Sequence, residues 1–232
     1  MAPVTVKKPV KKADKHPLAD IAHFAALVDR LGGIPLDRIR LHPPPGTATE
    51  KDVIRARCSS EPVRCELIDG VLVEKRKGIR EALWATLIVH YLWKFLEKHD
   101  LGLALGADGF VRLFPGRIRI PDVSFIPWTS LPKGELPDEA IASIVPDFMI
   151  EVLSKSNTKK EIDLKVQDYF KSGAKLVWVI NPVTQTADIY TAADHCVTTS
   201  KGAVLDAGPV LPGFKLSLKK MFAKGTRRKP KS

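Results

Sequence analysis

Residues 147–180 have the sequence DFMIEVLSKSNTKKEIDLKVQDYFKSGAKLVWVI, and this stretch decides the fold. The short apolar runs at 147–153 and 175–180 predict two buried strands, because both are rich in aliphatic and aromatic residues. Residues 158–171, which lie between them, have the periodicity of a helix. A strand, a helix and a second strand over this length are typical of a right-handed crossover, which pairs the two strands in parallel.

Both ends of the predicted helix carry local signals. Thr158 and Glu161 have the spacing of a capping box, in which a hydroxyl oxygen accepts a hydrogen bond from an early backbone N–H. Gly173 follows the last apolar position, and glycine there favours a left-handed helix end. The helix is therefore expected to begin and end close to these residues.

One face of this helix carries a lysine among apolar residues. Ile162, Val166 and Tyr169 recur at the spacing of a single helical face, and Lys165 occupies the same face. Glu151 lies in the middle of the preceding apolar strand. Burying either charge without a partner would be costly. We therefore expect Glu151 and Lys165 to share one polar pocket.

The rest of the chain predicts a mixed sheet flanked by helices, an α/β or α+β fold with one core and an N-terminal helical appendage. The pair Asp69-Gly70 between two apolar runs is typical of a tight hairpin turn. The expected elements are helices at 18–31, 49–57 and 79–99, the hairpin at 64–74, strands at 102–105, 110–114, 117–126 and 187–190, and an irregular connection at 127–145.

The positive charge is concentrated at the two ends of the chain. The 232 residues have a net charge of +11, of which 1–16 contribute +4 and 219–232 contribute +7, which leaves 17–218 neutral. Such tails attract polyanions without sequence preference, but they can equally serve only solubility. We divide the chain into a basic tail (1–17), a helical appendage with a proline-rich spacer (18–45), a main domain (46–218) and a second basic tail (219–232).

The sequence also limits where the protein works. It contains no apolar run of the roughly 18 residues needed for a transmembrane helix, and its basic N-terminus lacks the apolar segment of a secretory signal. Cys58, Cys65 and Cys196 show no disulfide or zinc spacing. These features favour a reducing, cytoplasmic environment and no membrane partner.

Two acids lie within apolar strands. The alternation of Ile118, Ile120 and Asp122 predicts one shared strand face, and Pro121 predicts a bend or an edge there. Asp122 and Glu151 on neighbouring strands, with a lysine nearby, suit a hard cation such as Mg²⁺, which prefers carboxylate oxygens. The alternative is a buried ion pair between Glu151 and the helix lysine that only fixes packing.

The order of motifs resembles one known family. Pro121-Asp122, the run 146–154, Lys165 with Tyr169, and the run 176–182 are similar to the Uma-two (Uma2) family of restriction-endonuclease-like proteins, within the PD-(D/E)xK nuclease superfamily. The segment 65–70, with Glu66, matches the hairpin of that family. The resemblance spans about Pro43 to Phe214. It implies a restriction-endonuclease-like core, and thus a nuclease-like domain at 46–218.

The resemblance implies a Mg²⁺-dependent endonuclease that hydrolyses DNA phosphodiester bonds, with Mn²⁺ as a substitute metal. It implies Asp122, Glu151 and the backbone carbonyl of Val152 as metal ligands, and DNA as the partner; a homodimer is compatible with it. The usual lysine two residues after the second acid is replaced by Leu153, and the family pattern places it on the next helix, at Lys165.

The resemblance leaves two points of the site open. A third acid would be Glu66 from the hairpin or Glu81 from the first turn of the long helix, and the sequence does not separate them. Lys155 lies closer in sequence to Glu151 than Lys165 does, but it falls in a polar loop and is the weaker candidate. The alternative functions are a catalytically silent nuclease-like module that binds DNA through its tails, and a protein-interaction domain.

Overall fold

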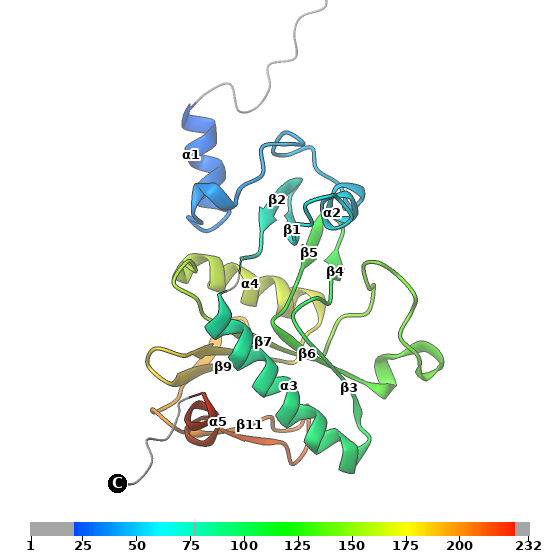
Figure 1. Cartoon of the computed structure of the whole chain (residues 1–232), viewed down its shortest axis with the longest axis vertical. Helices are drawn as coiled ribbons and strands as arrows, with labels where there is room; N and C mark the ends of the chain where they lie inside the picture. Colours follow the sequence, from blue (N-terminus) through cyan, green and yellow to red (C-terminus); the bar gives the residue numbers. More distant parts are fainter. Residues whose placement is uncertain (1–20, 77, 226–232) are drawn as a thin grey trace, which may run out of the picture.

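The computed structural model describes residues 21–76 and 78–225. These residues form a six-stranded sheet, a four-stranded sheet and a two-stranded ribbon (Figure 1). The helices are α1 (Ile21–Arg30), α2 (Glu50–Arg57), α3 (Ile79–His99), α4 (Lys159–Ser172) and α5 (Leu218–Lys224). The strands are β1 (Cys65–Ile68), β2 (Val71–Glu74), β3 (Gly102–Leu105), β4 (Val111–Phe114), β5 (Arg117–Arg119), β6 (Val123–Pro127), β7 (Phe148–Val152), β8 (Leu176–Asn181), β9 (Thr186–Ala192), β10 (His195–Thr198), β11 (Val204–Asp206) and β12 (Lys215–Ser217).

The unit β7–α4–β8 is the centre of the larger sheet, whose order is β10-β9-β8-β7-β6-β3. Strand β7 pairs in parallel with β8 and antiparallel with β6, and β8 pairs antiparallel with β9. The parallel crossover expected from the sequence is therefore confirmed. All five residues of β7 are buried, because both faces of the sheet are covered.

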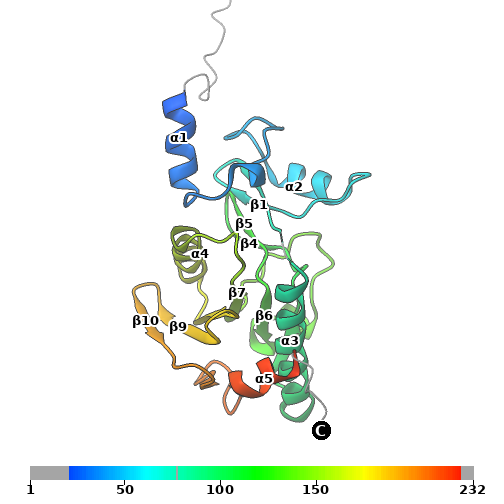
Figure 2. The same cartoon turned by 60° about the vertical axis from the view of Figure 1, so that its left-hand side comes forward.

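The two long helices lie on opposite sides of β6 and β7 (Figure 2). On the side of α3, Phe148 and Ile150 pack with Ile88 and Leu92 in one apolar cluster. On the side of α4, Met149 packs with residues of that helix, including Tyr169. Since side chains alternate along a strand, Glu151 shares the face of Met149 and points toward α4. This alternation places a carboxylate between the sheet and the helix that carries Lys165.

The smaller sheet, β2-β1-β5-β4, carries the hairpin and the N-terminal segment (Figure 1). Asp69 and Gly70 both have positive φ, 48° and 77°, as the tight hairpin turn requires. Leu27 and Leu31 of the 18–45 segment are buried against Val71 and Val73 of β2. The expected appendage therefore packs on the hairpin and forms an apolar cluster with it.

The expected single strand at 117–126 is wrong, because the chain changes sheet within it. Strand β5 belongs to the four-stranded sheet and β6 to the six-stranded sheet, and Pro121 lies between them. Proline has no N–H for a ladder hydrogen bond, so pairing stops there. Both Ile120 and Asp122 are buried next to this break. Asp122 thus lies at the junction of the two sheets, not within a strand.

The core extends further toward the C-terminus than the boundary at 218 suggested. Met221 and Phe222 of α5 are buried in the cluster that also contains Trp84 of α3. Strands β10, β11 and β12 were not expected either; β10 is exposed along its whole length, so it lacks the alternation that signals a strand. The tail at 1–17 and the end of the second tail, 226–232, lie outside the described residues.

The described residues contain no helix that is long and apolar enough to cross a membrane. Cys58, Cys65 and Cys196 are all free thiols.

The N-terminus of α4 depends on Thr158. Its Oγ1 accepts a hydrogen bond from Glu161 N at 3.0 Å and donates one to the carbonyl of Gly32 at 2.5 Å. Only half of the expected capping box forms, because the Glu161 carboxylate pairs with Arg38 instead. We expect Thr158→Ala to lower the free energy of unfolding by about 1 kcal/mol, the usual loss of an N-cap. Urea denaturation measures this; Thr158→Ser, which keeps the hydroxyl, is the control, and an equal loss in both variants would contradict the capping role.

Candidate active site

Asp122 and Glu151 lie next to each other, just before the start of β6 and near the end of β7. Val123 is paired with Ile150 in the antiparallel ladder, so Asp122 and Glu151 lie one step further along it. The backbone N–H of Val152 donates to Asp122 Oδ2 at 2.8 Å, which fixes this carboxylate. The side chains are nearly inaccessible to solvent, at 1% for Asp122 and 5% for Glu151. The fold therefore concentrates two negative charges in a buried position.

Lys165 reaches the same position from α4. Its Nζ lies 3.5 Å from Glu151 Oε1 and 3.0 Å from Glu66 Oε1. Tyr169, one turn further along the helix, donates its hydroxyl hydrogen to Glu151 Oε1 at 2.5 Å. The pocket that the sequence predicted for Glu151 and Lys165 is thus present. Of the two candidates for a third acid, Glu66 lies in it.

Lys75 also lies between the carboxylates of Asp122 and Glu151, and it was not among the residues that the sequence predicted for the site. Its Nζ is 2.6 Å from Asp122 Oδ1 and 3.6 Å from Glu151 Oε2, and it donates to the backbone carbonyl of Ile120. In the sequence it opens the run Lys-Arg-Lys, which is typical of a solvated surface. The signal that could have identified it is the period of two from Val71 and Val73, both buried, which places Lys75 on their face.

A second layer of ion pairs surrounds these residues. Arg119, which is 2% exposed, bonds Glu66 at 2.8 Å and Asp168 of α4 at 2.5 Å. Arg38 from the N-terminal segment makes two hydrogen bonds to Glu161, at 2.7 and 3.0 Å. Buried carboxylates that each have a guanidinium or ammonium partner avoid most of the penalty of burial. Neither arginine was predicted as part of the site, because their partners lie far away in the sequence.

The cluster determines which of its groups are charged. Burial disfavours the charge of Lys165, but Glu151 and Glu66 outweigh it and the pKa of Lys165 lies above its ordinary value. Burial also disfavours ionised Glu66, yet Lys165 and Arg119 hold the pKa of Glu66 well below its usual range. Burial, followed by the charge of Glu151, raises the pKa of Tyr169 well above 10.0. Lys165 is therefore a fixed cation and Tyr169 a neutral donor at neutral pH.

The oxygen atoms around Lys75 fit a hard cation. Two carboxylates and the carbonyl of Ile120 are the ligand types that Mg²⁺ accepts, and here they already surround a positive charge. Within residues 21–76 and 78–225, no three His, Cys, Asp or Glu side chains converge on one point as a metal cluster. A metal at this position would depend on Asp122 and Glu151, with backbone oxygen and water completing its shell.

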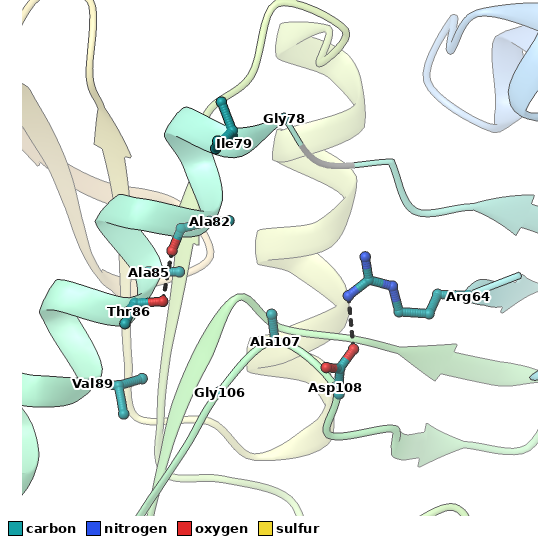
Figure 3. Close-up of a pocket in the computed structure, with 10 residues that line it drawn as sticks. All are labelled: Arg64, Gly78, Ile79, Ala82, Ala85, Thr86, Val89, Gly106, Ala107 and Asp108. Atoms are coloured by element: carbon teal, nitrogen blue, oxygen red, sulfur yellow. Dashed lines mark hydrogen bonds and ion pairs between the residues drawn. The ribbon is translucent and has the colours of Figure 1, made fainter. Parts of the chain in front are cut away.

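Two hollows border α3, and one of them lies next to the cluster. A cleft of about 720 Å³ is lined by Arg76, Arg80, Glu81 and Lys155, among others, and shares Arg76 and Ser154 with the small cavity at Lys75. Glu81 and Lys155 therefore lie beside the cluster and not within it. A second hollow, of about 420 Å³, lies between α3 and the turn after β3 (Figure 3). Small side chains of α3 line it, and the ion pair between Arg64 and Asp108 lies at its other side.

Comparison with known proteins adds two findings. The profile of the Uma2 family, described as "Putative restriction endonuclease", matches residues 52–219. A crystal structure of "a putative nuclease belonging to DUF820" from Anabaena variabilis ATCC 29413 is similar, with a TM-score of 0.61 and 20% sequence identity over 69% of this chain and 90% of that chain. At this identity the likeness concerns the fold. No curated protein shows significant similarity.

The lowered pKa of Glu66 predicts how stability depends on pH. The contribution of Glu66 is fully present above its ordinary pKa of 4.5 and is lost below it, because the unfolded chain then takes up a proton that the folded chain does not. Glu66→Gln removes this effect. We expect its difference from wild type in the free energy of unfolding to shrink by about 1.4 kcal/mol per pH unit below about pH 4.5.

Urea denaturation between pH 7 and pH 3 measures this difference. Leu67→Ala is the control, since it removes buried apolar contacts but no titrating group, and its difference from wild type is expected to stay constant. A constant difference for Glu66→Gln would contradict the assignment of an ionised, paired Glu66.

Proposed function

This chain belongs to the Uma2 family, and we propose that it is a metal-dependent endonuclease that hydrolyses DNA phosphodiester bonds. The observation that carries the proposal is the pair Asp122 and Glu151, both buried, with the ammonium of Lys75 between their carboxylates. Acids this deeply buried are rare unless they are paired or hold a metal. Nuclease families are typically metal-dependent, and two buried carboxylates are ligands that a divalent metal can use.

Asp122 and Glu151 would hold Mg²⁺, or Mn²⁺ in its place, with the carbonyl of Val152 as a further ligand. A bound Mg²⁺ lowers the pKa of a coordinated water and neutralises charge on the phosphate. The hydrogen bond from Val152 N leaves the other oxygen of Asp122 directed toward Lys75. Tyr169 fixes Oε1 of Glu151, so Oε2 is the oxygen that faces the cation position.

Lys165 would act through its charge. Because its pKa is raised, it remains an ammonium and cannot serve as a general base at neutral pH. Glu66 and Glu151 hold it on the helix side of the acids, where it can orient the attacking water or stabilise negative charge in the transition state. Glu66 is then a positioning residue for Lys165, and Arg119 holds Glu66 in place.

The cleft beside the cluster would receive the DNA backbone. Arg76, Arg80 and Lys155 line it, and it joins the small cavity at Asp122 and Glu151 through Arg76 and Ser154. Arginine and lysine side chains bind phosphates and release counterions on doing so. The cleft therefore supplies positive charge directly next to the proposed metal site.

Cleavage of plasmid DNA with Mg²⁺ tests the assignment of the site. We expect Asp122→Asn and Lys165→Met to reduce the cleavage rate by at least about 100-fold, since each removes charge that stabilises the transition state. Glu135→Gln and Lys94→Met are the matched controls, because they remove the same kinds of charge from exposed positions outside the cluster. Equal rates in all five proteins would reject the proposal.

DNA affinity as a function of salt tests the cleft. In an Asp122→Asn background, which prevents cleavage, we expect Arg80→Ala and Lys155→Ala each to reduce the slope of log affinity against log salt by about 1. Lys94→Ala is the control. If both slopes stay unchanged, and binding disappears only when residues 1–16 and 226–232 are removed, the chain is instead a silent module that binds DNA through its ends.

A further inference from the structure

Lys75 occupies the position where the carboxylates of Asp122 and Glu151 converge. Its ammonium contacts Asp122 at 2.6 Å, Glu151 at 3.6 Å and the carbonyl of Ile120, which are two anionic oxygens and one neutral oxygen. This is the kind of shell that a hard divalent cation takes from a protein. Lys75 thus provides the positive charge that a metal would otherwise provide.

A metal and the ammonium cannot occupy this position together. The cavity lined by Lys75, Asp122, Glu151 and Lys165 has a volume of about 10 Å³, close to the minimum for one water. Mg²⁺ usually keeps several of its waters when a protein binds it. The ammonium lies 2.6 Å from the oxygen of Asp122 that the metal would need. One of the two cations must therefore leave before the other can bind.

Of the two lysines at the site, Lys75 is the one that can leave. Lys165 is held in the middle of α4, is 2% exposed and pairs with Glu66 as well as Glu151. Lys75 follows the last residue of β2, its side chain is 7% exposed, and the next residue, Arg76, is exposed and lines the 720 Å³ cleft. A rotation of the Lys75 side chain toward that cleft would open the position without moving a helix or strand.

We propose that Lys75 is an internal competitor of the divalent cation: its ammonium neutralises Asp122 and Glu151 in the metal-free protein and moves into the cleft when the metal binds. The inference rests on the proposed metal site. It implies that metal affinity is lowered by the free energy needed to remove the ammonium from its oxygen partners. It also implies that metal binding exposes a lysine that is buried in the metal-free protein.

The first test measures Mn²⁺ binding without DNA, by electron paramagnetic resonance of the free ion. We expect Lys75→Met, which keeps most of the side-chain volume without its charge, to bind Mn²⁺ at least about tenfold more tightly than wild type. Lys94→Met, the same change at an exposed position, should bind like wild type. If wild type binds Mn²⁺ and Lys75→Met binds it equally or more weakly, the inference is overturned but the proposed metal site is not.

The second test uses the wild-type chain, so it does not depend on how the variant folds. Brief acetylation followed by mass spectrometry should leave Lys75 unmodified in the metal-free protein and modify it when Mn²⁺ is bound, while Lys94 reacts equally in both. A Lys75 that stays unreactive with Mn²⁺ bound would overturn the displacement, even if Lys75→Met binds more tightly through electrostatics alone. Asp122→Asn, which lacks a proposed metal ligand, is the reference for no binding. If no protein binds Mn²⁺ more tightly than this variant, both the inference and the proposed metal site are overturned.

Discussion

The rest of the structure depends on one constraint: Glu151 is a carboxylate within a strand that is buried on both faces. Such a charge has to be neutralised by groups brought to it from other parts of the chain. Lys165 and Tyr169 come from the helix that follows the strand, and Lys75 comes from the end of the hairpin. The packing of the helix and the hairpin against the sheet is therefore coupled to the electrostatics of a single side chain.

The ion pairs extend this coupling through the molecule. Glu66 joins the hairpin to α4 through Lys165 and to β5 through Arg119, and Arg119 returns to α4 at Asp168. Arg38 ties the N-terminal segment to the first turn of α4. A buried ionic network is weak evidence for stability, because apolar residues of similar volume often pack as well. Its presence next to a basic cleft is more easily explained by a function that needs fixed charges, such as phosphate chemistry.

Much of the fold could be predicted because local patterns and the tertiary structure agree. The alternation around Asp69-Gly70 gave the hairpin, the helical periodicity of 79–99 gave α3, and the length of 147–180 gave the parallel crossover. The predictions failed for two different reasons. Ile118 and Ile120 continue an alternating pattern toward Asp122, but the chain passes from one sheet to the other at Pro121. Strand β10 has no buried face and therefore no apolar side to predict it from.

The sequence by itself determined that Glu151 and Lys165 meet, because a strand and the helix after it fix their relative position within a few residues. It also supplied Asp122 as an acid of the site. Only the tertiary structure decided that Glu66 and not Glu81 joins them, and that Lys75, Arg119 and Arg38 complete the cluster. These groups lie between 45 and 123 residues from their partners. Contacts between residues so far apart in the sequence depend on how sheets and helices pack, and a local sequence pattern does not predict that packing.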